Sequence, residues 1–157
     1  MSKFKTRVFS IVLLIVLMIT LIPFSVSAYS SANSIPALTG NQRNDFVHVA
    51  ESQIGYREEY DNKTIFGADY GWNGVFWCAE FIWWCANKAG ISTSIIPKSA
   101  NSLDLIKNMT VVSNPQVGDL AANATHITIF YGDAGNGYFK GLGGNQSDSV
   151  KISTFTY

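Results

Sequence analysis

Residues 73–90 read NGVFWCAEFIWWCANKAG, and this stretch organises the rest of the chain. The Asn-Gly pair at its start predicts a turn, and Gly90 at its end is a typical helix stop. The apolar segment between them has the length of a helix that begins at Cys78. Unpaired N–H groups and the positive end of the helix dipole favour a thiolate, which is the nucleophilic form of cysteine. The stretch therefore predicts a central helix with a first-turn cysteine that is either reactive or simply buried.

The second cysteine, Cys85, follows Cys78 by seven residues. On a helix this spacing separates the two Cα atoms by about 10 Å, whereas a disulfide needs about 7 Å or less. We therefore expect two free thiols, with Cys85 as a small buried residue two turns along the same face. Two thiols without a nearby histidine provide no four-ligand zinc site, so no metal and no cofactor are expected.

The first 28 residues predict a secretory signal peptide. A basic start is followed by a wholly apolar run at residues 11–19 and by small residues at 26–28, which suit a signal peptidase. An uncleaved anchor is the alternative, and Thr20 and Pro23 make the run short against the about 20 apolar residues of a membrane span. We therefore expect a secreted protein, extracellular or in the cell wall, that has no membrane segment after cleavage.

Length and charge limit the possible size and partners of the chain that remains after signal cleavage. Removing 28 of the 157 residues leaves 129, which suits one domain with one core. Three of the 11 basic residues lie in the signal, so eight basic residues face 11 acidic ones and the net charge is −3. Lys and Arg are not clustered, which argues against a nucleic-acid partner. We expect a monomer.

The N-terminal half predicts helices and loops. Residues 29–41 are small and polar, and predict a linker or an ordered arm before a domain at residues 42–157. A helix is expected from a cap at Asn44 or Asp45 to about Ile54, with His48 on its solvated side.

Two further segments complete this half. Residues 56–72 predict a long ordered loop, in which calcium binding is disfavoured because the ligand alternation of a calcium loop is missing. Residues 99–108 predict a short helix with Leu103 and Ile106 inward, followed by an extended stretch that begins at residues 111–112.

Beyond Pro115 the pattern changes to strands. A turn at residues 115–120 leads into a strand, and residues 125–131 alternate with period two. Residues 132–137 predict a hairpin connection, and the remaining strands are expected at 138–142 and 150–157, separated by a glycine turn at 143–145. Helices followed by an antiparallel meander predict an α+β fold, with the N-terminal helices packed on a C-terminal sheet.

Three residues are candidates for catalysis. A thiol nucleophile needs a base within hydrogen-bond reach, and the base needs a third group that orients its ring. Cys78 begins a helix, His126 begins a strand, and the hairpin should return Asn145 to the level of His126. Each of the three also has a purely structural interpretation, because a lone cysteine, a strand histidine and a Gly-Gly-Asn turn are more often structural than catalytic. Their joint order favours a catalytic interpretation.

Six segments within residues 43–157 resemble the CHAP family, the cysteine, histidine-dependent amidohydrolases/peptidases of the papain-like superfamily. The segments are GY at 55–56, WCAEF at 77–81, WCANKAGI at 84–91, VGD at 117–119, HITI at 126–129 and GGN at 143–145. The resemblance implies a papain-like fold and a peptidoglycan hydrolase, either an N-acetylmuramoyl-L-alanine amidase or a peptide endopeptidase. Its partner would be a stem or cross-bridge peptide.

The resemblance also implies roles for single residues. Cys78 would attack an amide carbonyl to form a thioester, His126 would act as base and then acid, and Asn145 would orient His126. The Cys78 backbone N–H would hold the oxyanion, with Asn73 as a candidate second donor. Trp77 is a candidate for the cleft wall, although an aromatic residue beside a buried helix belongs to the core at least as often.

The chain departs from the family pattern at Gly143, where many relatives have a glutamate two residues before the asparagine. This difference keeps an alternative open, in which the exported domain is weakened or inactive and serves as a cell-wall binding or interaction module.

Overall fold

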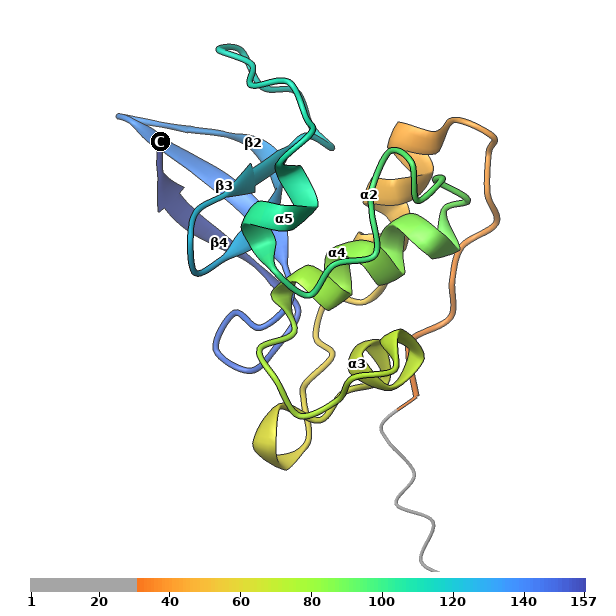
Figure 1. Cartoon of the computed structure of the whole chain (residues 1–157). Helices are drawn as coiled ribbons and strands as arrows, with labels where there is room; N and C mark the ends of the chain where they lie inside the picture. Colours follow the sequence, from red (N-terminus) through yellow and green to blue (C-terminus); the bar gives the residue numbers. More distant parts are fainter. Residues whose placement is uncertain (1–30) are drawn as a thin grey trace, which may run out of the picture.

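The computed structural model describes residues 31–157, so the predicted signal peptide at residues 1–28 lies outside the described part. Helices precede strands along the described chain (Figure 1), which confirms the α+β class. The helices are α2 (Gln42–Ser52), the 3-10 helix η1 (Tyr60–Asn62), α3 (Ile65–Tyr70), α4 (Cys78–Lys88) and α5 (Ser102–Ile106). The strands are β1 (Leu120–Ala122), β2 (Ile127–Gly135), β3 (Tyr138–Gly143) and β4 (Lys151–Thr156). Among the described helices, none has the length and apolar character that a membrane crossing requires.

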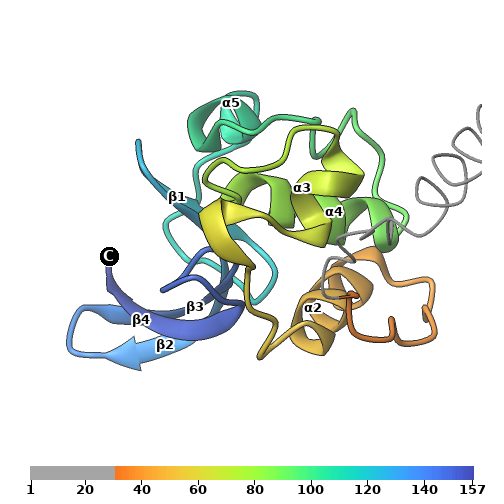
Figure 2. The same cartoon turned by 90° about the horizontal axis from the view of Figure 1, so that it is seen from below.

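Helix α4 lies at the centre of the molecule, with the sheet on one side and α2 and α3 on others (Figure 1, Figure 2). Every side chain from Cys78 to Ala86 is buried, and Asn87 is the first exposed one. A helix that is apolar nearly all round is expected to be enclosed in this way. The predicted helix is confirmed, but its buried surface extends around the whole helix and not along one face.

The four strands form one antiparallel sheet in the order β1-β2-β3-β4, which confirms the predicted meander. Ile127, Ile129 and Leu142 are fully buried and belong to the core shared with the helices. Thr128 and Phe130 alternate with the two isoleucines and therefore lie on the other face of the sheet. The sheet thus has one face against the helices and a second face that carries Thr128 and Phe130.

The prediction of a loop at residues 56–72 is wrong, because the segment contains η1 and α3. Thr64 caps α3 through its side chain, and Gly71 ends it with φ 93°. The ring of Phe66 in α3 lies 4.7–5.5 Å, between centroids, from the rings of Tyr56, Trp77, Phe81 and Trp84. Six residues are too few to show a helical period, so packing around Phe66 decides this helix.

Two other helix predictions need correction. The N-terminal helix is capped by Asn41, whose side chain accepts a hydrogen bond from the Asn44 N–H, and it ends before Ile54, which is exposed. Helix α5 is shorter than predicted, and it buries Leu105 while Leu103 is 47% exposed. In a helix of five residues, the position of its partners determines which side chain turns inward.

The strand boundaries also differ from the prediction. Strand β2 continues to Gly135, so the hairpin turn consists only of Asn136 and Gly137. Register shifts between Phe130 and Gly132 and between Asp133 and Gly135 bend this strand, which is why alternation fails there. Residues 111–112 form no strand, and Val111 is 96% exposed.

The N-terminal arm is ordered from residue 33 onward by contacts with α2. The Asp45 carboxylate accepts hydrogen bonds from the Thr39 N–H, the Thr39 hydroxyl and the Gly40 N–H, at 2.7–3.0 Å. Asn33 and Gln53 exchange two further hydrogen bonds, at 2.9 and 3.1 Å. These contacts hold residues 33, 39 and 40 against α2.

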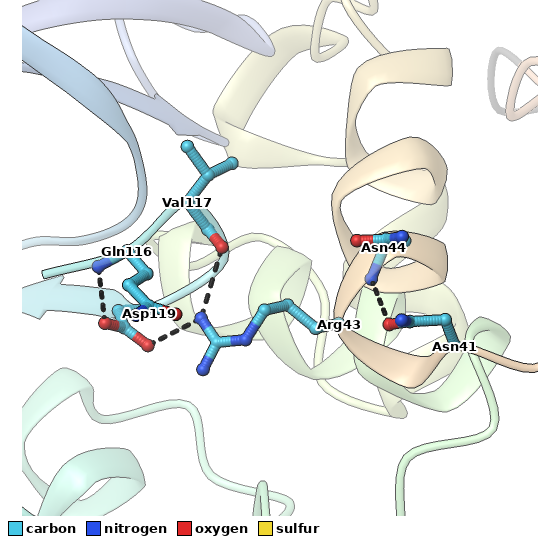
Figure 3. A network of polar contacts seen from close by, with 6 residues as sticks. All are labelled: Asn41, Arg43, Asn44, Gln116, Val117 and Asp119. Atoms are coloured by element: carbon cyan, nitrogen blue, oxygen red, sulfur yellow. Dashed lines mark hydrogen bonds and ion pairs between the residues drawn. The ribbon is translucent and has the colours of Figure 1, made fainter.

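Arg43 ties α2 to the turn before β1 (Figure 3). Its guanidinium donates to Asp119 Oδ1 at 2.7 Å and to the Val117 carbonyl at 3.1 Å. Gly118 between them has φ 97°, and a Cβ there would lie 2.9 Å from Arg43 Cγ. The Val-Gly-Asp segment therefore has a structural role, which fixes the start of the sheet against α2.

Gly144 provides a test of the helix–sheet contact. A Cβ at this position would lie 2.7 Å from Phe81 Cβ and would also overlap the Trp77 ring. We expect Gly144→Ala to lower the free energy of unfolding by about 3 kcal/mol, because the core has no room for a methyl group. Gly40→Ala is the control, since Gly40 has φ 87° but open space, and should cost about 1 kcal/mol. If urea unfolding shows that both variants lose the same free energy of unfolding, Gly144 does not lie this close to Trp77 and Phe81.

Candidate active site

Cys78 occupies the first turn of α4. The cap residue, Trp77, makes no side-chain hydrogen bond to the helix, so the first N–H groups are available to other acceptors. The Cys78 sulfur lies close to the backbone N–H groups of Ile127, Ala79 and Cys78 itself, which lower its pKa. The Ile127 contact places the thiol beside the start of β2, one residue from His126.

Cys78 is buried, with a relative exposure of the residue of only 6%. This burial raises the pKa of Cys78 above the ordinary thiol value, and it outweighs the three N–H groups that lower the pKa. The Glu80 carboxylate raises the Cys78 pKa further. The helix-start N–H groups therefore favour the thiolate, as expected, but desolvation outweighs them in this structure.

His126 lies directly before β2 and is held through its backbone. The Asn123 side chain accepts from the His126 N–H at 2.9 Å, and the Asn123 N–H donates to the His126 carbonyl at 2.9 Å. The imidazole stacks on the Phe155 ring at 5.7 Å between centroids. Its Nε2 atom is buried without a hydrogen-bond partner in the described chain, and burial lowers the His126 pKa. The ring is therefore neutral at neutral pH.

Asn145 follows β3 in a left-handed conformation with φ 55°, which asparagine tolerates better than most residues. It shares with His126 the lining of a cavity of about 260 Å³, which we call the His126 pocket. The residues that line it are His126, Asn145, Gln146, Ser147, Lys151, Ser153 and Phe155. Within residues 31–157 the Asn145 side chain makes no hydrogen bond to the imidazole, and Cys78 is not part of this lining.

The turn at Gly143 is filled by a residue that the sequence analysis did not consider. A Cβ at Gly143 would lie 2.5 Å from the Gln146 amide and 2.9 Å from Thr128 Oγ1. The Gln146 amide, which is buried, has a partner at each atom when its oxygen accepts from the Gly143 N–H at 3.0 Å and from the Thr128 hydroxyl at 3.2 Å. Its NH₂ group then donates to Ser153 Oγ at 2.6 Å and to the Lys151 carbonyl at 3.2 Å.

Gln146 therefore joins the ends of β2, β3 and β4 beside His126, in the space that a side chain at position 143 would take. Its sequence signal is weak, since a glutamine after a Gly-Gly-Asn turn is expected on the surface.

The two candidates for the oxyanion and the cleft take different places. Asn73 accepts hydrogen bonds from the Thr64 and Gly74 N–H groups at 2.9 and 3.1 Å, and its Nδ2 atom is buried without a described partner. Trp77 is fully buried, and its indole N–H donates to Glu58 at 2.6 Å. The Trp77 side chain thus belongs to the core and not to a cleft wall.

Glu80 is a second residue that the sequence analysis missed. It lies in the first turn of α4, is fully buried, and has no hydrogen-bond partner for either carboxylate oxygen in the described residues. Burial raises its pKa from 4.5 to about 7. A single acid in an otherwise apolar helix was the available signal. Helix α3 passes close by, since a Cβ at Gly67 would lie 2.9 Å from Glu80 Oε2.

Comparison of the chain with protein families, with curated proteins and with solved structures gave no match. Within residues 31–157, no group of three or more His, Cys, Asp or Glu side chains is placed to hold a metal ion. The chemistry of the site therefore has to be inferred from Cys78, His126 and their surroundings.

Glu80 predicts how stability depends on pH. Its pKa is raised on folding, so its stabilising contribution is complete below about pH 4.5 and is lost as pH rises through about 7. The shift corresponds to at most about 3 kcal/mol. We expect Glu80→Gln to be more stable than wild type at pH 8 by up to this amount, and to differ little at pH 4. Urea unfolding from pH 4 to 8 measures this difference.

Asp148→Asn is the matched control, because Asp148 is exposed. It should change stability little at either pH. A Glu80→Gln variant whose advantage is the same at pH 4 and pH 8 would contradict an unpartnered acid at this position.

The Gln146 contacts predict the effect of restoring a carboxylate at position 143. We expect Gly143→Glu to destabilise the protein by about 1–3 kcal/mol, because the new side chain displaces the Gln146 amide. Gln146→Ala should cost about 1–3 kcal/mol through lost hydrogen bonds. The double variant should lose less than the sum, since one change makes room for the other. Additive losses in thermal or urea unfolding would show that the two positions do not compete.

Proposed function

We propose that the chain is a secreted cysteine amidohydrolase that cuts peptidoglycan, with a papain-like arrangement of Cys78, His126 and Asn145. The bond would be either the amide that links the glycan to its peptide or a bond within the stem or cross-bridge peptides. The observation that carries the proposal is the position of the Cys78 sulfur close to the Ile127 N–H, which lowers the Cys78 pKa. It joins a helix-start thiol to the backbone next to a histidine whose buried Nε2 has no described partner.

The chemistry follows from the resting state of these groups. Cys78 is a thiol and His126 a neutral imidazole at neutral pH, because burial raises the pKa of the first and lowers that of the second. In the proposed reaction the imidazole takes the thiol proton as the sulfur attacks the amide carbon. The imidazolium then gives this proton to the leaving amine, and a thioester remains. Water, activated by the imidazole, hydrolyses the thioester and restores the thiol.

The developing oxyanion needs N–H donors at the start of α4. The Cys78 and Ala79 N–H groups lie there and contact the sulfur in the resting structure. Asn73 remains a candidate second donor, since its buried Nδ2 lacks a described partner. Asn145 shares the pocket of His126 and is the proposed orienting group, although reaching the ring requires a side-chain movement.

One observation favours the alternative function, a non-catalytic exported module that binds the cell wall. Cys78 is buried with a raised pKa, which is typical of a structural cysteine rather than an activated one. In this alternative Cys78 serves the packing between α4 and β2, and His126 stacks on Phe155. A catalytic Cys78 requires that bound substrate, or a small opening of the site, exposes the sulfur.

Paired cysteine variants test the proposal. We expect Cys78→Ala to abolish release of soluble fragments from purified peptidoglycan while the circular dichroism spectrum stays unchanged. Cys85→Ala should keep most of the activity, because Cys85 is fully buried in the same helix and contributes only packing. Lysis that survives Cys78→Ala, or equal loss from both variants, would overturn the assignment. Mass spectrometry of the fragments would identify the bond.

Histidine variants and thiol labelling provide the controls. His48→Ala should be neutral, since His48 is exposed on α2, whereas His126→Ala should remove the activity.

Iodoacetamide labelling of Cys85→Ala from pH 6 to 10, with and without peptidoglycan fragments, separates the two functions. Labelling that fragments accelerate below pH 8 supports the enzyme. A thiol that reacts only above its ordinary pKa under both conditions supports the binding module.

A further inference from the structure

The His126 pocket has an unusual balance of charge. Lys151 and His126 are the only ionisable residues in its lining, which contains no Asp or Glu. The Lys151 ammonium donates to Ser147 Oγ at 2.9 Å, and no carboxylate of residues 31–157 forms an ion pair with it. The pocket therefore presents a positive charge whose neighbour is a neutral hydroxyl.

The polar atoms of the lining are mainly hydrogen-bond donors. Ser147 Oγ accepts from Lys151, and Ser153 Oγ accepts from the Gln146 NH₂ group, so both hydroxyl hydrogens remain available to another acceptor. The Asn145 side chain makes no hydrogen bond within the described chain. The lysine ammonium, which has three N–H groups, uses only one of them on Ser147. A bound group with several hydrogen-bond acceptors would therefore find free N–H and O–H donors in this pocket.

The walls of the pocket indicate what that partner is. The pocket is an open depression of about 260 Å³, and a neighbouring cavity of about 610 Å³ shares His126 and Phe155 with it. The stacked rings of His126 and Phe155 form an apolar wall beside the donors. A carboxylate on a short aliphatic segment, such as one amino-acid residue, matches both the donors and the apolar wall.

We propose that the His126 pocket binds a free carboxylate of the substrate peptide, with Lys151 as the charged anchor and Ser147 and Ser153 as further donors. This inference rests on the proposed function, because it assigns the pocket to the peptide part of peptidoglycan. A charge-assisted hydrogen bond to a carboxylate is stronger than a neutral one, so the pocket selects free acids over carboxamides. It makes Lys151 a specificity-determining residue.

The bound carboxylate would also act on the candidate base. An opposite charge nearby favours the imidazolium form of His126, and therefore opposes the burial that lowers its pKa in the free protein. Substrate with a free carboxylate would thus stabilise the protonated histidine that forms when the Cys78 thiol loses its proton.

The test uses Cys78→Ala protein, which binds without turnover, and a stem pentapeptide in two forms. One form has its carboxyl groups free, and the other has all of them amidated. We expect isothermal titration calorimetry to give about tenfold tighter binding of the free acid, with NMR shifts at Ser147, Ser153 and His126. Lys151→Met should remove this preference. Lys140→Met is the matched control, because Lys140 is exposed on β3 outside the pocket lining, and should retain the preference.

Equal affinity for the two peptides, or a preference that survives Lys151→Met, would overturn the inference. Binding of neither peptide by a protein whose wild type cuts peptidoglycan would overturn it as well. Competition by millimolar inorganic phosphate that is as strong as competition by acetate would assign the pocket to anions in general and also reject carboxylate recognition. Lysis by Cys78→Ala, in contrast, refutes the proposed function and leaves the peptide preference to stand by itself.

Discussion

The fold depends on the close approach of the first turn of α4 to the glycine turn after β3. Gly144 has no side chain, so the Trp77 ring and the Phe81 Cβ occupy the space where one would lie. This contact brings the start of α4 to the start of β2, where the Ile127 N–H meets the Cys78 sulfur. A larger residue at position 144 would separate the helix from the sheet, and the Cys78 sulfur from the Ile127 N–H.

The same enclosure sets the electrostatics of the site. Burial raises the pKa of Cys78 and of Glu80, and lowers that of His126, so all three groups favour their neutral forms. Cys78 and His126 are therefore uncharged at neutral pH, whereas Lys151 carries a positive charge in the His126 pocket. The proposed carboxylate of the substrate would lie between these groups, beside both Lys151 and the imidazole.

Gly143 and Gln146 show how the structure changes the meaning of a sequence difference. By comparison with the resembled family, the absence of a carboxylate at position 143 suggested a weakened site. In the structure the Gln146 amide fills this space and connects three strands through Thr128, Gly143, Lys151 and Ser153. The position is therefore closed by a polar group that returns from three residues later, and it is not left as a gap beside His126.

The sequence by itself determined the elements that carry strong local signals. The apolar length before Gly90 specified α4, period-two alternation specified β2, and the glycine turns placed the hairpins, so the α+β order followed. Tertiary structure decided the short helix α3, whose six residues show no period, and the inward turn of Leu105 in α5. It also decided the protonation of Cys78, Glu80 and His126, because desolvation depends on neighbours that are distant in the chain.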